Sequence, residues 1–223
     1  MLAVHCGDEV PYEEALRWQR LLVTARSDNA IDDVLLTLTH ERVYTAGRHA
    51  NVAKHVLGTT DIPVVPIDRG GDVTYHGPGQ LVAYPIIRLA HAKAVRPYVA
   101  ALEEACVRTA ADFGVSAYPD PKRTGVWVGD RKLAAVGIRI DGGVTSHGLA
   151  FNVAPDLDDF AGIVPCGIAD AGVTSLAELG AAAALTDVRR RLVHHLGDTL
   201  DRPVQQASPA DLGLSLTGAA AGD

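Results

Sequence analysis

The sequence has few cysteines, few aromatic residues and no long apolar run. Its 223 residues include three cysteines, Cys6, Cys106 and Cys166, which are too few and too scattered for a disulfide framework and form no CxxC pair. We therefore expect reduced thiols and no bound metal. No window approaches the ~18 to 20 apolar residues of a membrane span, and residues 1–8 carry no basic leader. These absences predict a cytoplasmic protein without a membrane partner.

Positive charge is also scarce. The formal net charge is −7, from 27 acidic and 20 basic residues, and the run at 189–191 is the only basic cluster. Nucleic acid is therefore not an expected partner. What the chain does contain is 48% hydrophobic and 21% charged residues, an ordinary globular composition, over a length that suits one large domain.

Hydrophobic periodicity and turn residues predict the elements of one α+β domain. Its sheet should be mixed or mostly antiparallel, with helices flanking it. Thr186 is a plausible N-cap for the last helix. We expect a folded domain over residues 1–207 and a disordered Ala/Gly-rich tail over 208–223, with loops at 40–49 and 68–79. Strands are expected at 2–7, 34–39, 64–67, 81–87, 125–128, 133–140 and 144–153, and helices at 11–26, 96–112 and 186–200.

The segment 69–80, RGGDVTYHGPGQ, is the first that indicates chemistry. Its four glycines let the backbone approach a ligand closely, while Arg69, Thr74, Tyr75 and His76 supply polar groups. The alternative is a tight loop that binds nothing, and for a Gly/Pro cluster alone the two interpretations are about equally favoured. The spacing matches neither a P-loop nor GxGxxG, so a phosphate-binding loop is not predicted.

Cys166 and Lys132 form a second hypothesis. Cys166 stands between Pro165 and Gly167, a setting that presents a thiol at a turn, although a lone cysteine is more often a small buried hydrophobe. Lys132 begins an apolar strand and, read alone, is more often a solvated strand end. An ammonium near a thiol favours the thiolate, so together the two residues could act as nucleophile and base.

Small residues mark a third feature. On the strand 147–152, HGLAFN, side chains alternate, so His147 should share a face with Leu149 and Phe151, opposite Gly148 and Ala150. Together with the small residues of 134–137, AAVG, the second face could wall a narrow apolar slot. Close packing of a helix against these faces explains the pattern equally well.

Four segments, taken in order, resemble the lipoyl(octanoyl) transferase family of lipoate biosynthesis. They are residues 69–80, 132–137 (KLAAVG), 147–152 and 165–168 (PCGI), and the first is highly specific for the family. Residues 34–48 also look like the family's early strand and loop. The sequence departs from the pattern at Glu41, where the family usually has a proline after the histidine.

The resemblance implies a fold like the catalytic domains of biotin protein ligases and lipoate-protein ligases. The family's catalytic cysteine matches Cys166, and the lysine that tunes this thiol matches Lys132. Because position 72 varies in the motif, we expect Asp72 to contact substrate only through its backbone. The family's acyl-substrate contacts match Arg69, Gly70, Gly71, Asp72, Val73, Thr74, Tyr75 and His76, then Ala135, Val136 and Gly137, then Gly148, Leu149 and Ala150.

The resemblance further implies transfer of octanoyl from octanoyl-acyl carrier protein to a lysine of lipoyl domains, through a thioester on Cys166. The implied acceptors are the lipoyl domains of 2-oxoacid dehydrogenases and the glycine cleavage H protein, and the enzyme is expected to be a monomer. Because the donor is an activated thioester, neither ATP nor a metal cofactor is expected. One alternative is an ATP-dependent lipoate- or biotin-protein ligase, for which we find no nucleotide-binding sequence. Another is a non-catalytic module that binds lipoyl domains.

Overall fold

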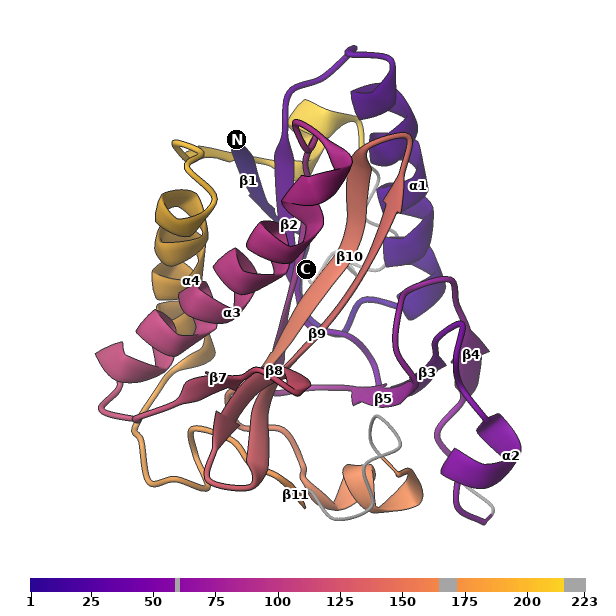
Figure 1. Cartoon of the computed structure of the whole chain (residues 1–223), viewed down its shortest axis with the longest axis vertical. Coiled ribbons are helices and arrows are strands. Elements are labelled where there is room, and N and C mark those ends of the chain that lie inside the picture. The colour runs from indigo at the N-terminus through magenta and orange to yellow at the C-terminus, as the bar shows by residue number, and fades with distance from the viewer. Residues whose placement is uncertain (59–60, 165–171, 215–223) are drawn as a thin grey trace, which may run out of the picture.

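The computed structural model describes residues 1–58, 61–164 and 172–214 (Figure 1). The helices are α1 (Tyr12–Ser27), α2 (Val52–His55), α3 (Val95–Asp112) and α4 (Leu185–Thr199), with 3-10 turns η1 (Ala92–Ala94), η2 (Asp158–Gly162) and η4 (Pro209–Leu212). The strands are β1 (Leu2–His5), β2 (Val34–Leu38), β3 (Val43–Ala46), β4 (Val64–Pro66), β5 (Val73–His76), β6 (Gln80–Ile86), β7 (Tyr118–Asp120), β8 (Arg123–Val128), β9 (Arg131–Asp141), β10 (Val144–Asn152), β11 (Gly172–Val173) and β12 (Gln205–Ala207).

A mixed sheet forms the centre of the domain. Within the described residues it has nine strands, in the order β12-β1-β2-β6-β10-β9-β8-β7, with β11 beside β9. Strand β1 is parallel to its neighbours β2 and β12, and β11 is parallel to β9, whereas the other pairs are antiparallel. The predicted mostly antiparallel α+β sheet is therefore confirmed, and the strands β8, β9 and β10 follow one another in it as antiparallel neighbours.

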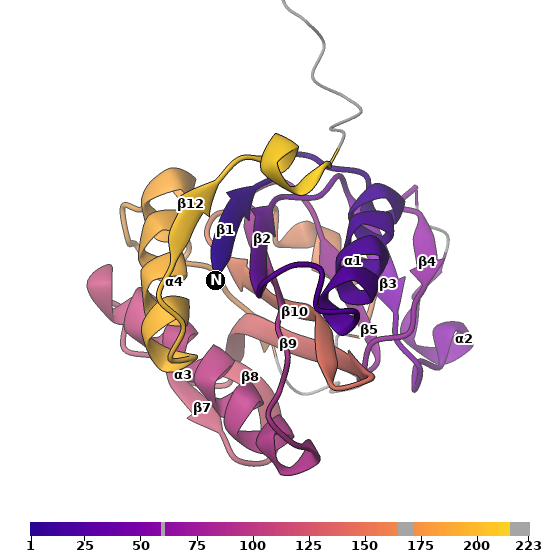
Figure 2. The same cartoon turned by 90° about the horizontal axis from the view of Figure 1, so that it is seen from above.

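Helices cover both faces of this sheet (Figure 2). On one face, α3 and α4 pack together, and their apolar side chains form a core with Leu35, Leu133 and Phe151. On the other face, α1 packs through Trp18 and Leu22 against strand residues of a second apolar cluster. Because each sheet face has its own helical cover, β2, β6 and β10 contribute side chains to both cores.

The longest helix, α3, follows its sequence pattern closely. Tyr98, Leu102, Cys106 and Thr109 recur at helical spacing and are buried against the sheet. The helix ends before Gly114, whose φ of 76° is the left-handed conformation of a helix C-terminal glycine. The helix predicted over residues 96–112 is therefore confirmed.

A second, smaller sheet was not predicted. Strands β4, β3 and β5 form it in the order β4-β3-β5, where we expected loops at 40–49 and 68–79 around the predicted strand 64–67. Strand β5 is only four residues long and lies between glycines, which hid its alternation from the sequence pattern. Side chains of this small sheet, including Tyr44, pack with Ile62 and Phe160 in a third apolar cluster.

Two expectations near the C-terminus are wrong. Helix α4 begins at Leu185 after Ala184, with no side-chain cap, so Thr186 is not the N-cap. The disordered tail does not begin at residue 208, because Ser208 and Asp211 form a capping box around η4 and Leu214 is buried in the α1-side core. Residues 215–223 lie outside the described part of the chain.

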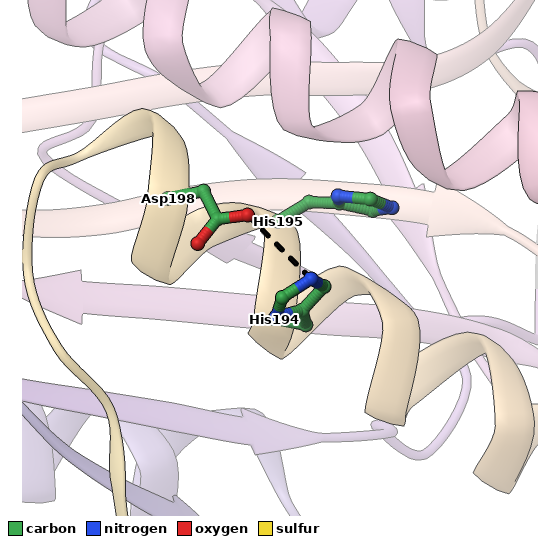
Figure 3. Close-up of side chains that lie close together, drawn as sticks. All are labelled: His194, His195 and Asp198. Atoms are coloured by element: carbon green, nitrogen blue, oxygen red, sulfur yellow. Dashed lines mark ion pairs between the residues drawn. The ribbon is translucent and has the colours of Figure 1, made fainter.

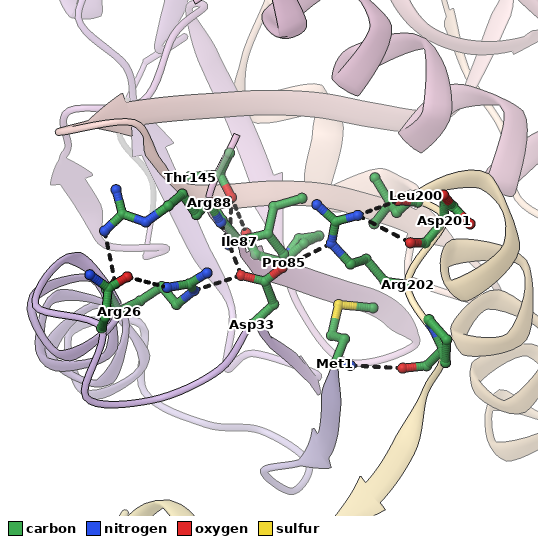
Figure 4. Close-up of polar contacts among 12 residues, drawn as sticks. Met1, Arg26, Asp33, Pro85, Ile87, Arg88, Thr145, Leu200, Asp201 and Arg202 are labelled. Atoms are coloured by element: carbon green, nitrogen blue, oxygen red, sulfur yellow. Dashed lines mark hydrogen bonds and ion pairs between the residues drawn. The ribbon is translucent and has the colours of Figure 1, made fainter. Parts of the chain in front are cut away.

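Asp33 joins three separate segments at one end of the sheet (Figure 4). Its carboxylate accepts hydrogen bonds from Arg26 Nε at 2.7 Å, from the Arg88 N–H at 3.0 Å and from Arg202 Nε at 2.9 Å. Although burial acts to raise it, these donors hold the pKa of Asp33 below its usual value. The carboxylate thus links α1, the segment that follows β6 and the C-terminal segment.

A search of the helices in the described residues found none with the length and apolar character needed to cross a membrane.

Candidate functional site: an apolar cavity beside Lys132

One cavity brings together the Gly-rich segment and the two strands β9 and β10. We call it the acyl cavity and define it by its lining. All the sequence-predicted substrate residues except Val73 and Tyr75 line it, although the predicted runs lie far apart in the chain. The lining is Tyr12, Arg69, Gly70, Gly71, Asp72, Thr74, His76, Tyr84, Ala135, Val136, Gly137, His147, Gly148, Leu149 and Ala150.

Arg69 fixes the Gly-rich segment against both neighbouring strands. The side chain is 7% exposed, and its Nη2 donates to the Thr45 carbonyl at 2.7 Å and to Thr45 Oγ1 at 2.9 Å. The Gly70 N–H donates to the Ile138 carbonyl of β9 at 2.9 Å. A buried, hydrogen-bonded arginine of this kind is a structural clamp for the segment, and it places the backbone of 69–72 along one side of the cavity.

The small residues have two different roles. A Cβ on Gly137 would lie 3.1 Å from Arg69 Cδ and 3.3 Å from the Gly70 carbonyl oxygen, so glycine lets the Gly-rich segment approach β9. A Cβ on Gly148 would instead overlap the backbone carbonyl of Ala83 in β6. Gly148 is therefore required by strand packing as well as lining the cavity. Ala135 and Ala150, paired in register, keep the side of the cavity narrow and apolar.

Val73 and Tyr75 do not line the cavity, contrary to expectation. Because side chains alternate along β5, these two point away from Thr74 and His76 into the third apolar cluster. The Tyr75 hydroxyl donates to Asp159 Oδ2 at 2.6 Å. We expected all eight residues of 69–76 to contact the substrate, whereas a strand presents only every second side chain to one face.

The structure adds three aromatic or imidazole groups to the lining that the predicted site lacked, namely Tyr12, Tyr84 and His147. Tyr84 donates its O–H to His40 Nε2 at 2.7 Å, and His40 Nδ1–H donates to the Val10 carbonyl at 2.8 Å. Burial lowers the pKa of His40 to about 4 and raises the pKa of Tyr12 to about 12, so both are neutral at pH 7. No local sequence signal marks Tyr12 and Tyr84.

His76 is also held as a neutral group. Its Nδ1–H donates to Gln80 Oε1 at 2.8 Å, and Gln80 Nε2 in turn donates to Asn152 Oδ1 at 3.0 Å. Burial, followed by the proximity of His40, holds the pKa of His76 well below its usual value. Its ring stacks on Tyr12 at a centroid distance of 5.8 Å. His76 thus gives the cavity an uncharged wall.

Lys132 lies beside the acyl cavity and does not line it. Its side chain is 8% exposed, and its Nζ lies 4.8 Å from the centroid of the Trp127 ring, a cation–π contact. A smaller cavity next to it is lined by Lys132 together with Thr74, Ala135 and Ala150, and these last three also line the acyl cavity. The interpretation of Lys132 as a solvated strand end is therefore wrong. Lys132 is buried and faces the predicted substrate region.

Cys166 lies outside the described residues, as do Pro165 and Gly167. The other two thiols are described and buried. Burial raises the pKa of Cys6 to about 12, and burial, followed by the charge of Glu103, raises the pKa of Cys106 further. A thiol with a raised pKa is a poor nucleophile at neutral pH. Cys6 and Cys106 are therefore packed thiols of low reactivity.

A group of side chains of the metal-binding type lies elsewhere, on α4 (Figure 3). His194 Nε2 lies 3.5 Å from Asp198 Oδ2, and His195 Nε2 donates to Asp112 Oδ2 of α3 at 2.7 Å. The Asp112 contact joins α4 to α3. Because α4 contributes no lining residue to the acyl cavity, this group is separate from the candidate site.

Comparison with known proteins agrees with the resemblance seen in the sequence. A family model described as the lipoyl protein ligase A/B catalytic domain matches residues 11–197. An octanoyltransferase of Thermobifida fusca is 46% identical over 200 residues, covering 86% of this chain and 85% of that protein. An octanoyltransferase of Mycobacterium avium is 47% identical over 209 residues, covering 90% and 88%.

Solved structures with the same fold are more distant in sequence. A lipoate-protein ligase A bound with ATP has a TM-score of 0.73 at 16% identity and covers 93% of this chain and 89% of that one. A biotin protein ligase from Aquifex aeolicus has a TM-score of 0.53 at 11% identity, covering 90% and 68%. These likenesses confirm the predicted ligase-like fold. Together with the family match and the close relatives, they show that the chain belongs to the lipoyl protein ligase A/B catalytic domain family, on its octanoyltransferase side.

Proposed function

We propose that this protein transfers an octanoyl group from octanoyl-acyl carrier protein to a lysine of lipoyl domains, through a thioester on Cys166. The observation that carries the proposal is the continuity between a narrow, mostly apolar cavity and the buried Lys132, through the shared lining of Thr74, Ala135 and Ala150. The named octanoyltransferases at 46 and 47% identity support the acyl group assigned. A lipid-like chain in the cavity would gain roughly 0.8 kcal/mol for each buried methylene.

The proposed chemistry has two half-reactions. The Cys166 thiolate attacks the donor's thioester carbonyl, and collapse of the tetrahedral intermediate expels the carrier's pantetheine thiolate, leaving octanoyl on Cys166. The ε-amine of the acceptor lysine then attacks this thioester, forms the amide and expels the Cys166 thiolate. Lys132 is proposed to take the proton of the Cys166 thiol and, as the ammonium, to stabilise the thiolate. It then gives this proton to the departing pantetheine thiolate, and the neutral Lys132 amine takes the proton that the attacking acceptor amine loses.

The nucleophile is assigned to Cys166 for three reasons. Its PCG motif matches the family's catalytic cysteine, and the described alternatives, Cys6 and Cys106, are buried thiols of raised pKa. Furthermore, Val173 pairs with Lys132, so the chain that follows residues 165–171 returns to this lysine.

The expected partners are the acyl carrier protein donor and lipoyl-domain acceptors, and no cofactor is expected. The acceptors are lipoyl domains, including those of 2-oxoacid dehydrogenases and the glycine cleavage H protein, and the enzyme acts as a monomer. Since the donor thioester is already activated and the product amide is stable, the transfer consumes no ATP and uses no metal. An ATP-dependent ligase of the same fold would instead activate a free acid.

Intact-protein mass spectrometry tests this proposal directly. After exposure to octanoyl-acyl carrier protein, the wild-type chain should gain one octanoyl group on Cys166, and addition of a lipoyl domain should move it to the acceptor lysine without ATP. Cys166→Ser should show no thioester and no transfer, while Cys106→Ser serves as the matched control and keeps both. An adduct on Cys6 or Cys106, or transfer only from free octanoate with ATP, would overturn the proposal.

A further inference from the structure

His147 separates the acyl cavity from a second, polar cavity. We call the latter the polar pocket; its lining is Leu16, Gln19, Arg20, Val23, Thr24, Asp68, Arg139, Asp141, Ser146 and His147. Of these residues, His147 is the one that also lines the acyl cavity. Its side chain is 2% exposed. Because it borders both cavities, it stands between the two spaces. The two cavities are neighbours, divided at this position by one imidazole.

The backbone at His147 breaks the alternation of β10. Its φ is 55°, the left-handed region that residues other than glycine rarely adopt. The expected sharing of a face with Leu149 and Phe151 is therefore wrong: Leu149 and Phe151 enter the core under α3 and α4, whereas the His147 ring turns to Tyr12 and Asp68. A backbone conformation of this kind costs roughly 1–3 kcal/mol and persists where the surroundings fix it.

Three partners fix it here. The His147 N–H donates to Gln19 Oε1 at 2.7 Å, and His147 Nε2–H donates to Asp68 Oδ1 at 2.9 Å. The Tyr12 hydroxyl lies 3.4 Å from Nδ1. Burial lowers the pKa of His147 although the Asp68 carboxylate acts to raise it, so the ring is neutral and accepts at Nδ1 at pH 7. Each ring nitrogen is thus engaged, and the imidazole has one defined position.

The distance from the Ala135–Ala150 pair, which lines both the acyl cavity and the cavity beside Lys132, to this wall fits the proposed substrate. Ala150 pairs with Ala135 near Lys132, and His147 pairs with Ile138, three register steps further along the same two strands. At ~3.3 Å per residue, this span is about 10 Å, comparable to an extended eight-carbon chain. An acyl chain whose carbonyl lies at the Ala135–Ala150 pair would therefore reach His147 with its methyl end.

We propose that His147 is the end wall of the acyl cavity and determines the length of the acyl chain that the enzyme accepts. The inference rests on the proposed function and adds a specificity-determining residue to it. A longer chain would have to displace the imidazole and break its hydrogen bonds with Asp68 and Tyr12. Removal of the imidazole would join the acyl cavity to the polar pocket and give the chain end more room.

The test compares acyl-carrier-protein donors from hexanoyl to tetradecanoyl in wild type and His147→Gly. Glycine adopts a positive φ without strain, so this variant removes the ring and keeps the backbone. We expect the ratio of kcat/KM for dodecanoyl over octanoyl to rise at least tenfold. Loading of Cys166, followed by mass spectrometry without acceptor, should show the same change. Thr24→Ala is the matched control, because Thr24 lines only the polar pocket, and its ratio should stay at the wild-type value.

The possible failures are distinguishable. If wild type does not transfer octanoyl at all, the proposed function fails. If wild type transfers octanoyl and His147→Gly lowers the rates for all chain lengths equally, only the end wall is overturned. His147→Asn decides the question should the glycine variant not fold, since asparagine also tolerates a left-handed backbone and has a shorter side chain. An unchanged chain-length ratio in a folded asparagine variant would likewise refute the inference.

Discussion

Val173 of β11 pairs directly with Lys132 of β9, and the following N–H, that of Thr174, donates to the Lys132 carbonyl at 3.0 Å. The pairing returns the chain to the lysine only seven residues after Cys166 in sequence. Backbone hydrogen bonds on both sides of a side chain restrict its motion. Lys132 is therefore placed by the sheet, at a fixed position beside the acyl cavity.

Replacement of Lys132 by arginine tests its role as a base. Arginine keeps the positive charge but does not release its proton in proteins, so octanoyl transfer should fall by about 100-fold or more. Lys122→Arg, at an exposed turn, is the matched control and should transfer at the wild-type rate. Thermal unfolding of both variants checks that they are folded. A near-normal rate in a folded Lys132→Arg enzyme would remove this residue from the mechanism.

Enlargement of Ala135 should narrow the acyl cavity where it meets the Lys132 cavity. In Ala135→Val, two added methyl groups enter a space bounded by Ala150 and Thr74, so we expect octanoyl transfer to fall about tenfold while butyryl transfer falls less. Ala111→Val, on the exposed side of α3, is the control and should preserve the ratio. Equal losses for both acyl groups would show that the valine acts on folding and not on the cavity.

His40 should make the protein less stable in mild acid. Its pKa is lowered to about 4 by burial among Tyr12, Tyr84 and His76, whereas in the unfolded chain it is about 6.5. Between these values the unfolded state binds more protons, so stability is complete above pH 6.5 and is lost as the pH falls toward 4, by up to roughly 3 kcal/mol.

Urea unfolding at pH 7.5 and pH 5.0 measures this effect. The unfolding midpoint of wild type should drop between the two, and His40→Gln should drop less because glutamine does not titrate. The buried His76 acts in the same direction, so some pH dependence should persist in the variant. The same drop in both proteins would contradict the assignment to His40.

Loss of the Asp33 carboxylate should destabilise the fold without touching the acyl cavity. Asp33→Ala leaves the two arginines and the Arg88 N–H without this acceptor, at a cost of roughly 3 kcal/mol in the free energy of unfolding. Asp130→Ala, at the exposed turn between β8 and β9, should change it by less than about 0.5 kcal/mol. Chemical denaturation compares the two. Equal effects would mean that the Asp33 contacts contribute little.

The sequence predicted those helices and strands whose periodicity and turn residues lie within the element itself. The helix predicted at 96–112 and the strands predicted at 125–128, 133–140 and 144–153 match α3, β8, β9 and β10, because helical and strand periods act over a few positions. The small sheet of β3, β4 and β5 escaped prediction because its four-residue strands form only by pairing with each other. The tail was misjudged for a similar reason: Leu214 is ordered by packing against a distant core.

The sequence by itself named the candidate residues of the site, which are Cys166 and Lys132, the arginine and glycines of residues 69–71, and the small residues of β9 and β10. Only the tertiary structure decided that Val73 and Tyr75 face away from the cavity, that Tyr12 and Tyr84 join its wall, and that His147 closes its far end. Side-chain type is encoded locally, whereas the direction of a side chain depends on backbone dihedrals and on partners that the chain brings from afar.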